Sequence, residues 1–385
     1  MIFATPGLSR EDLAVLELIE RQREQLRHHV NTNPRRWTGF LRRNAFARAI
    51  QGSNSIEGYD ATYDDAVAAV DGDEPSAADR ETWLAVTGYR DAMTYILQIA
   101  RDPHFKYDPQ LIRSLHYMMI KYDLSKHPGQ WRPGYVRVVD QRTGKTAYEG
   151  PDAQQVPELV DELVDFLRDR DDTPDIVKAA MAHLNLTLIH PFSDGNGRMA
   201  RALQTLVLVR EGMLGETFSS IEEWLGRNTR AYYDVLAEVG RGRWQPQRDA
   251  APWMRFCLRA HYQQAATLIR RNNEMGRVWE QIAGIVEQHD LPDRCEAALV
   301  DAAYGFRVTN ARYRHSAEVS EHQAGRDLKR LADLGLLIAV GEKRGRYYVG
   351  SDDLKRLRAS LRDPRRADDP YDVILRDMAP ELPLA

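Results

Sequence analysis

Residues 190–201 read His-Pro-Phe-Ser-Asp-Gly-Asn-Gly-Arg-Met-Ala-Arg, a polar segment between two apolar runs with helical spacing. The first run extends from Ala179 to Ile189 and the second from Met199 to Val209. Glycines give the backbone of such a loop unusual freedom, and the N-terminus of the following helix attracts an anion. The segment therefore predicts a phosphate-handling loop between two helices.

The side chains of this loop suit metal-assisted transfer of a phosphoryl or nucleotidyl group. A histidine with an ordinary pKa of about 6.5 is a suitable general base at neutral pH, and a carboxylate is a ligand type that Mg²⁺ prefers. Two arginines three residues apart share one helix face and can clamp phosphates. The expected roles are base for His190, metal ligand for Asp194, backbone close to phosphate for Gly195 and Gly197, amide donor for Asn196, and clamp for Arg198 and Arg201.

These twelve residues resemble the signature of the Fic family, H-P-F-x-D/E-G-N-G-R-x-x-R, at every fixed position. The resemblance implies a mainly α-helical core and an enzyme that transfers AMP from ATP to a Ser, Thr or Tyr hydroxyl of a target protein, or of itself. It also implies a role for each residue of the loop. His190 would activate the hydroxyl, Asp194 would hold Mg²⁺ on the α- and β-phosphates, Gly195, Asn196 and Gly197 would form the anion hole, and Arg198 and Arg201 would hold the β- and γ-phosphates.

A β-hairpin is expected at about residues 136–148, within a sequence that otherwise reads as helices. By resemblance this hairpin is the family's flap, which positions a target segment by strand addition. The preceding residues 129–132, Gly-Gln-Trp-Arg, resemble the segment that leads into that flap.

Residues 53–58 read Ser-Asn-Ser-Ile-Glu-Gly and resemble the family's inhibitory motif, [S/T]-x-x-x-E-[G/N], formed here by Ser53, Glu57 and Gly58. Ser53 and Glu57 are four residues apart and share a helix face. A carboxylate at the end of a helix is unfavourable against the helix dipole, which suggests a cationic partner elsewhere. The resemblance implies that this partner is Arg201, that the pair keeps Arg201 from the γ-phosphate, and that Glu57 also serves as a base for removing AMP from targets.

From about residue 291 to 350 the pattern becomes three short helices and a β-hairpin, which resembles a winged helix-turn-helix module. Such a module places a helix in a DNA groove and a wing on the backbone. A solvated helix face in a protein-binding module is equally compatible with the pattern. The candidate contact residues are Arg326, Lys329 and Arg330 on the helix, and Lys343 and Arg344 in the wing.

Composition narrows the remaining classes. The net charge of −4 does not indicate a general polyanion binder. Cys257 and Cys295 are far apart and without metal-like spacing, which is typical of reduced core cysteines. No signal peptide and no apolar run of about 18 residues or more is apparent, so a cytoplasmic protein without membrane contact is expected.

The expected organisation is a mainly α protein with a Fic helical core, a small hairpin flap and a C-terminal winged helix-turn-helix module. Its parts are an N-terminal helical region (1–79), the catalytic core (80–250), connecting helices (251–290), the winged-helix-like module (291–350) and a tail (351–385) that is loosely ordered from about residue 363. Homodimers are common for such cores, but the sequence does not fix the oligomeric state.

Two alternatives to an autoinhibited adenylyltransferase stay open at this point. The first is transfer of a group from another nucleotide, which a panel of nucleotides would reveal. The second is a DNA-binding regulator in which the Fic core only senses nucleotide, and salt-dependent binding to duplex DNA would support it.

Overall fold

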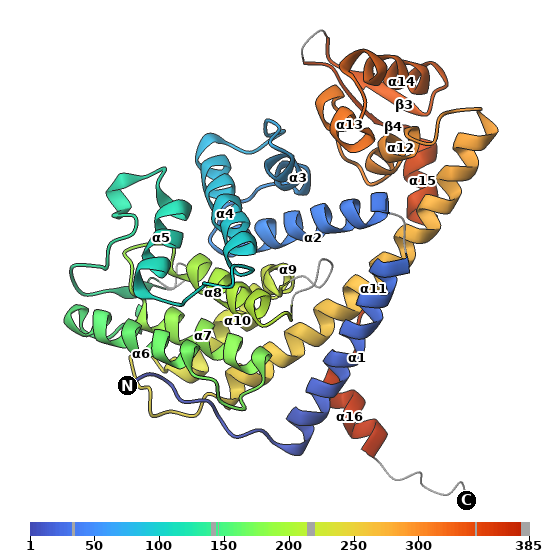
Figure 1. Ribbon diagram of the computed structural model, residues 1–385. Coiled ribbons are helices and arrows are strands. Elements are labelled where there is room, and N and C mark those ends of the chain that lie inside the picture. The colour runs from blue at the N-terminus through green and yellow to red at the C-terminus, as the bar shows by residue number, and fades with distance from the viewer. Residues whose placement is uncertain (33–34, 140–143, 145, 214–219, 343–344, 379–385) are drawn as a thin grey trace, which may run out of the picture.

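The computed structural model describes residues 1–32, 35–139, 144, 146–213, 220–342 and 345–378 (Figure 1). It confirms the mainly α-helical fold, and none of its described helices has the length and apolar character that a membrane span requires. The elements of the body are α1 (Arg10–Thr32), α2 (Arg35–Ile56), α3 (Tyr63–Asp71), α4 (Arg80–Ile99), α5 (Pro109–Ile120), η1 (Leu124–Lys126), β1 (Arg137–Val139), β2 (Thr146–Glu149), η2 (Ala153–Gln155), α6 (Val156–Arg168), α7 (Asp175–Ile189), α8 (Asn196–Arg210), α9 (Glu222–Arg227), α10 (Thr229–Gly240) and α11 (Ala251–Gln288).

Helices α7 and α8 form the centre of the body, and the other helices pack around them (Figure 1). Both are buried on nearly every side, as expected for helices that are apolar around most of their circumference. Leu186 and Ile189 of α7 share one hydrophobic core with Met199 and Leu203 of α8. The loop between the two helices is therefore anchored at both ends in the hydrophobic core of the body.

The expected hairpin is present as β1 and β2, which pair antiparallel with Arg137 opposite Glu149. The outer side of β2 is fixed to the body, because Glu149 N donates to Gly242 O at 2.9 Å. The Tyr148 hydroxyl also donates to Leu188 O of α7 at 2.7 Å. Within the described residues, β1 has no strand partner on its other side and forms a free edge.

Helix α11 (Ala251–Gln288) is one continuous helix of 38 residues, whereas the sequence analysis expected several connecting helices over residues 251–290. Gly276 within it costs only about 1 kcal/mol relative to alanine. Leu268 before it lies in the core of the body, and Val278 after it lies in the core of the C-terminal part. Tertiary packing thus carries the helix through a weak segment.

Beyond α11 the chain forms α12 (Cys295–Ala303), α13 (Asn310–Ala317), α14 (Glu321–Asp333), β3 (Leu337–Val340), β4 (Tyr347–Gly350) and α15 (Asp352–Ser360). Three helices followed by an antiparallel pair of strands is the element order expected from the sequence. Leu299, Leu328, Leu337 and Tyr348 lie in a separate hydrophobic core. Leu354 of α15 belongs to the same core, so this C-terminal module (residues 291–361) extends past the predicted boundary at residue 350.

Part of the segment expected to be a loosely ordered tail forms a helix. After α15 it forms α16 (Pro370–Met378), which packs against α1 and α11. The Tyr371 hydroxyl donates to Asp12 Oδ1 at 2.9 Å, and Ile374 is buried. The helix begins at a proline, which is favourable at the first helical position, but its apolar face is too short to stand out in a charged sequence.

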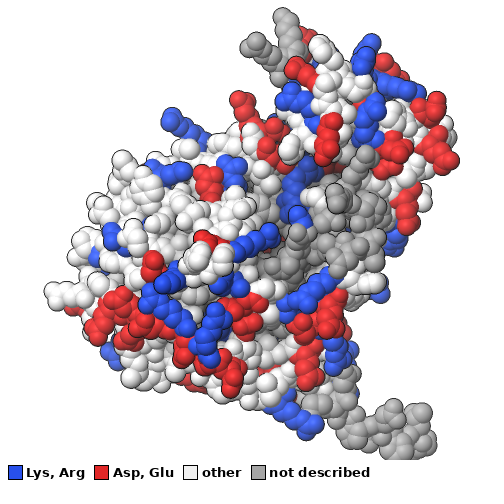
Figure 2. All heavy atoms as spheres, in the orientation of Figure 1, with Lys and Arg blue, Asp and Glu red and all other residues white. Residues whose placement is uncertain are grey.

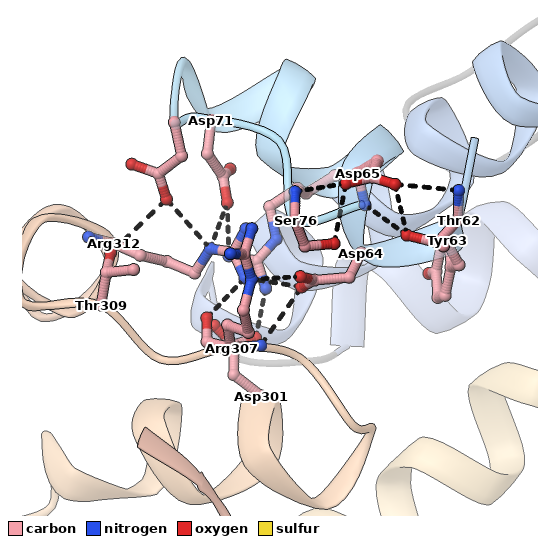
Figure 3. A network of polar contacts seen from close by, with 12 residues as sticks. Thr62, Tyr63, Asp64, Asp65, Asp71, Ser76, Asp301, Arg307, Thr309 and Arg312 are labelled. Carbon is pink, nitrogen blue, oxygen red and sulfur yellow. Dashed lines mark hydrogen bonds and ion pairs between the residues drawn. The ribbon is translucent and has the colours of Figure 1, made fainter. Parts of the chain in front are cut away.

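A network of buried ion pairs joins the C-terminal module to the N-terminal helices (Figure 3). Arg312 of α13 is 2% exposed and lies 2.9 Å from Asp71 and 3.4 Å from Asp64 of α3. Arg43 of α2 pairs with both Asp71 and Asp301 of α12. Burial alone would lower the pKa of Arg43, but these two carboxylates raise it above its ordinary value. The network fixes the module against α2 and α3.

Candidate active site

Two residues with left-handed backbone shape the loop between α7 and α8. His190 caps the end of α7 with a φ of 52°, and Gly195 caps the start of α8 with a φ of 75°. A Cβ atom on Gly195 would lie 2.9 Å from Ile120 Cδ1, so both the backbone angle and the available space require glycine there. A non-glycine residue in this region is uncommon and often marks a functional constraint, which draws attention to His190.

The imidazole of His190 is in the protonation state that a general base needs. Its Nδ1 lies 3.2 Å from Thr187 O. A carbonyl oxygen only accepts, so Nδ1 carries the hydrogen and Nε2 keeps a free lone pair. Burial lowers the pKa of His190 to about 4, so the ring is neutral at physiological pH. Arg132 Nε holds the backbone from the other side by donating to His190 O at 2.8 Å.

The side chain of Asn196 closes the loop instead of facing an anion. Its Oδ1 accepts from Phe192 N at 2.9 Å and its Nδ2 donates to Phe192 O at 2.8 Å. This pairing corrects the expectation that the side-chain amide donates to an oxyanion, because both polar atoms already have partners. The backbone of Asn196 keeps its position at the N-terminus of α8.

The N-terminus of α8 presents backbone donors to the loop. The first hydrogen bond within the helix runs from Met199 N to Gly195 O at 2.9 Å. The amides of Asn196, Gly197 and Arg198 precede it and are the orphan donors of the helix end. Such a helix end is a ready site for a phosphate or another anion.

Arg198 is a buried guanidinium without enough partners. It is 1% exposed, and its Nε and Nη1 have no hydrogen-bond partner in the described part of the chain. Its Cζ lies 4.9 Å from the centre of the Tyr59 ring. Because an unpaired buried donor is costly, the geometry points to an anionic group as the missing partner.

Asp194 lies at the mouth of the loop with its carboxylate ionised. Burial would raise its pKa, but Lys126, whose Nζ lies 2.9 Å from Asp194 Oδ2, lowers it below its ordinary value. No cluster of three or more potential metal-ligating side chains occurs in the described residues. Mg²⁺ is commonly held by one or two carboxylates together with substrate phosphates, so a single ionised Asp194 fits such a cation.

Arg201 is held by the predicted inhibitory residues. Its Nε donates to Ser53 Oγ at 2.8 Å, and its Nη2 donates to Ser53 O at 3.0 Å and to Glu57 Oε1 at 2.6 Å. Arg201 is 1% exposed, whereas the Glu57 side chain is 23% exposed. Burial would lower the pKa of Arg201, but the Glu57 carboxylate raises it. The sequence therefore predicted the correct pair of residues across 144 positions.

Two glycines allow this approach. A Cβ atom on Gly197 would lie 2.3 Å from Glu57 Oε1, so the carboxylate rests directly on the first turn of α8. Gly58 follows the end of α2 with a φ of 83°, which lets the chain turn away after Glu57. The contact between Glu57 and α8 thus depends on glycine in both segments.

His116 supports the loop and was not identified from the sequence. Its ring stacks on Phe192 with centroids 3.7 Å apart and planes 3° apart. Nδ1 accepts from Gly129 N at 2.9 Å, so Nε2 carries the hydrogen and donates to Asp194 O at 2.9 Å. A lone histidine on the amphipathic helix α5 gives no sequence signal for this role.

Arg132 was also not assigned a role, although it lies in the segment that resembled the lead-in to the flap. Besides His190 O, its guanidinium binds Gly134 O and Pro151 O at 2.6 Å each. It therefore links both ends of the hairpin region to the backbone of His190. His183 is also buried, and its two ring nitrogens form hydrogen bonds with Gln204 and Tyr232.

The candidate DNA-contact residues lie far along the chain from this site, on the C-terminal module. Arg326, Lys329 and Arg330 are all exposed on α14. One nitrogen of Arg330 already has a partner within the protein, because Nη2 donates to Asp290 O at 2.9 Å, just beyond the end of α11. Figure 2 shows acidic and basic side chains interspersed over the module on one face. Lys343 and Arg344 lie outside the described residues, and contact with DNA stays a prediction.

Comparison with known proteins agrees with this geometry. The model of a family described as Fic/DOC matches residues 106–208. The chain is 33% identical over 95 residues to a probable protein adenylyltransferase of Aquifex aeolicus, covering 25% of this chain and 27% of that protein. It is 25% identical over 263 residues to the protein adenylyltransferase Fic of Nematostella vectensis, covering 66% of this chain and 56% of that protein. In both cases the match spans less than two thirds of the relative.

Among solved structures, a Fic family protein from Desulfovibrio desulfuricans G20 has a TM-score of 0.58 at 21% identity, covering 90% of this chain and 98% of that one. Fic-1 from C. elegans has a TM-score of 0.52 at 21% identity, covering 67% of this chain and 72% of that one. These likenesses support the fold.

Proposed function

Because residues 106–208 match the model of the Fic/DOC family, we propose that the protein is an autoinhibited protein adenylyltransferase. It transfers AMP from ATP to a Ser, Thr or Tyr hydroxyl of a target protein, and to itself. The observation that carries the proposal is the convergence of a neutral His190, the free amides at the start of α8 and the two unpartnered nitrogens of Arg198 in one loop.

In the proposed reaction, the Nε2 lone pair of His190 takes the proton of the target hydroxyl. The hydroxyl oxygen then forms a bond to the α-phosphorus, the bond from that phosphorus to the bridging oxygen breaks, and diphosphate leaves with the electron pair. A general base of this kind typically contributes about 10²–10⁴-fold to the rate. The hydrogen bond from Nδ1 to Thr187 O keeps the ring in the required tautomer.

The phosphates would be bound by groups that are already in place. The amides of Asn196, Gly197 and Arg198 point out of the N-terminus of α8 and stabilise negative charge without reorganisation. The buried guanidinium of Arg198 gains the partners it lacks when it binds an oxyanion.

Asp194 would hold Mg²⁺ together with the phosphates, after Lys126 has given up its ion pair with this carboxylate. When bound, the cation would neutralise phosphate charge and orient the leaving group. His116 fixes the backbone of Asp194 through its hydrogen bond to the carbonyl oxygen.

The inhibition would arise from the pair of Arg201 and Glu57. As long as Glu57 and Ser53 hold this arginine, it is not available to the γ-phosphate, and the carboxylate lies against the start of α8. A triphosphate would then enter beside a negative charge and without its second clamp. The same carboxylate is proposed as the base that activates water for removal of AMP.

The free edge of β1 is the proposed docking position for the target segment. An extended peptide can add to such an edge through main-chain hydrogen bonds. The anchoring of β2 by Tyr148 and Gly242 keeps this edge in place beside α7.

Intact mass spectrometry after incubation with ATP and Mg²⁺ tests the proposal. We expect one or more AMP additions to the Glu57→Gly protein, and no addition to a protein that also carries His190→Ala. The double variant should still bind ATP, because the phosphate-binding groups are unchanged. Addition of AMP that persists in the double variant would remove His190 from the role of base.

A panel of nucleotides separates the proposal from its nearest alternative. If GTP, UTP or CTP supports modification of the Glu57→Gly protein at least as well as ATP, adenylyl transfer is not the main reaction. If no nucleotide modifies it or any offered protein, the assignment as a transferase fails.

A further inference from the structure

A polar cavity lies where the C-terminal module meets the body, near the point at which α2, α11 and α15 converge (Figure 1). Its volume is about 730 Å³, within the range of about 300–1,000 Å³ that is usual for small-molecule sites. Its walls come from α2, α9, α11, α15 and the segment 362–367. None of the residues of the loop 190–201 lines it, so it is separate from the candidate active site.

The cavity concentrates positive charge in a chain whose net charge is −4. Glu274 and Asp363 are the carboxylates in its wall, and Glu223 lies behind it. Eight arginines line it against these acids: Arg48, Arg227, Arg270, Arg271, Arg358, Arg362, Arg365 and Arg366. Such an excess of guanidinium groups in one hollow is unfavourable through mutual repulsion unless an anion balances it.

The carboxylate of Glu223 balances only part of this positive charge. Glu223 is 5% exposed and pairs with three of the arginines, Arg271 at 2.7 Å, Arg48 at 3.6 Å and Arg227. Burial would raise the pKa of Glu223, but these arginines lower it to about 2. The single negative charge is therefore shared among three cations.

Other polar groups of the cavity lack partners. Within the described residues, no carboxylate forms an ion pair with Arg270, Arg362 or Arg366. The Nε atom of Arg270 and the Nδ2 atom of Asn272 are buried without a hydrogen-bond partner, and Asn272 is 5% exposed. A buried donor without a partner costs about 1–3 kcal/mol, so these donors indicate a ligand with several acceptor oxygens.

We propose that this cavity binds a small anion with at least two phosphoryl groups, at a site distinct from the one that would bind ATP for transfer. Guanidinium groups bind phosphate oxygens in pairs of parallel hydrogen bonds, and several arginines around one hollow can each take different oxygens. The ligand would satisfy Arg270 and Asn272 from inside the cavity, with Arg362 and Arg366 closing on it from the segment after α15.

Titration calorimetry with inorganic tripolyphosphate tests the site on the full chain. The test variant is Arg270→Gln/Arg362→Gln/Arg366→Gln, which removes three charges without replacing buried apolar groups. The matched control is Arg21→Gln/Arg170→Gln/Arg230→Gln, which removes three charges from side chains that are at least 70% exposed and lie outside the cavity. We expect the cavity variant to bind at least tenfold more weakly than the control.

Hydrogen exchange locates the bound anion independently of any enzymatic activity. Protection by tripolyphosphate is expected at residues 40–48, 263–275 and 358–367. ATP that binds at the cavity at least tenfold more tightly than tripolyphosphate would identify a nucleotide as the ligand, and equal affinity would identify the phosphate chain alone. In both cases the proposal stands, whether or not AMP transfer is observed.

Three results would overturn the proposal. One is affinity in the cavity variant within twofold of the control. Another is protection confined to residues around the loop 190–201. The third is tight binding of duplex DNA that depends on the cavity arginines, without measurable binding of tripolyphosphate.

Discussion

Replacing Glu57 with glycine should have opposite effects on activity and on stability. The variant removes the acceptor at 2.6 Å from Arg201 Nη2 and leaves the two bonds from Arg201 to Ser53 intact. A hydrogen bond to a charged group contributes about 1.5–3 kcal/mol. Because the Glu57 side chain is 23% exposed, we take a value of about 2 kcal/mol, toward the lower end of that range.

If Arg201 must leave Glu57 before ATP is correctly bound, this free energy opposes every turnover. Each 1.36 kcal/mol corresponds to a factor of about ten, so the Glu57→Gly protein should be modified about 30-fold faster than the wild type. At the same time its free energy of unfolding should fall by about 2 kcal/mol, because a buried arginine loses its counter-charge. The rate is measured by intact mass over time with ATP and Mg²⁺, and the stability by thermal unfolding without nucleotide.

Asp12→Asn is the matched control, because it also neutralises a carboxylate that pairs with an arginine. Asp12 is fully buried and lies 3.1 Å from Arg255, away from the loop between α7 and α8. This variant should lose stability without any gain in modification. The reasoning is refuted if folded Glu57→Gly protein is modified at the wild-type rate, or if Asp12→Asn accelerates modification as strongly.

Three further predictions follow from other parts of the structure. Since burial lowers the pKa of His190 to about 4, kcat/KM of the Glu57→Gly protein should stay level from pH 8 down to about pH 5; half-loss near pH 6.5 would show that the histidine is not desolvated. Burial raises the pKa of Glu222 from 4.5 to about 7, so the folded state binds a proton that the unfolded state has released, and this group makes the protein less stable as pH rises between those values. Glu222→Gln should flatten the dependence of the thermal midpoint on pH over this window, and parallel curves for the two proteins would contradict it. The Arg312→Met variant leaves Asp64 and Asp71 without a shared cation, which should lower the free energy of unfolding by about 3 kcal/mol. Limited proteolysis should then cleave the link to the C-terminal module more readily. Unchanged cleavage would show that the network does not hold the module.

Local patterns were the reliable part of the sequence. The apolar runs on either side of the loop predicted α7 and α8, and the motif positions predicted that Glu57 meets Arg201. A spacing rule is sufficient for the two helices, because few residues within one short segment determine their geometry. The contact of Glu57 with Arg201 joins residues 144 positions apart, and it was expected from the resemblance to the family's motif.

One feature that the sequence did not reveal is local, and two others depend on segments far apart in the chain. Asn196 looked like an anion donor, but its side chain is used by Phe192 four residues earlier. The length of α11 depends on packing on both sides of Gly276. The arginine cavity has no signature at all, because its walls are brought together only when α2, α11 and the segment after α15 meet in the folded protein.

Helix α2 connects the C-terminal module to the loop between α7 and α8. Arg43 in its first half is bound to the C-terminal module, and Ser53 near its end is bound to Arg201. Ten residues of helix separate these two anchors, about 15 Å, and Gly52 packs so closely on α9 that a Cβ atom would lie 2.4 Å from Glu222 O. A short helical segment that is held at both anchors cannot shift at one of them alone. If binding at the module moves this segment of α2, the affinity of the loop between α7 and α8 for its nucleotide must change. Thermodynamic reciprocity then requires that the nucleotide change the binding affinity at the module by the same factor.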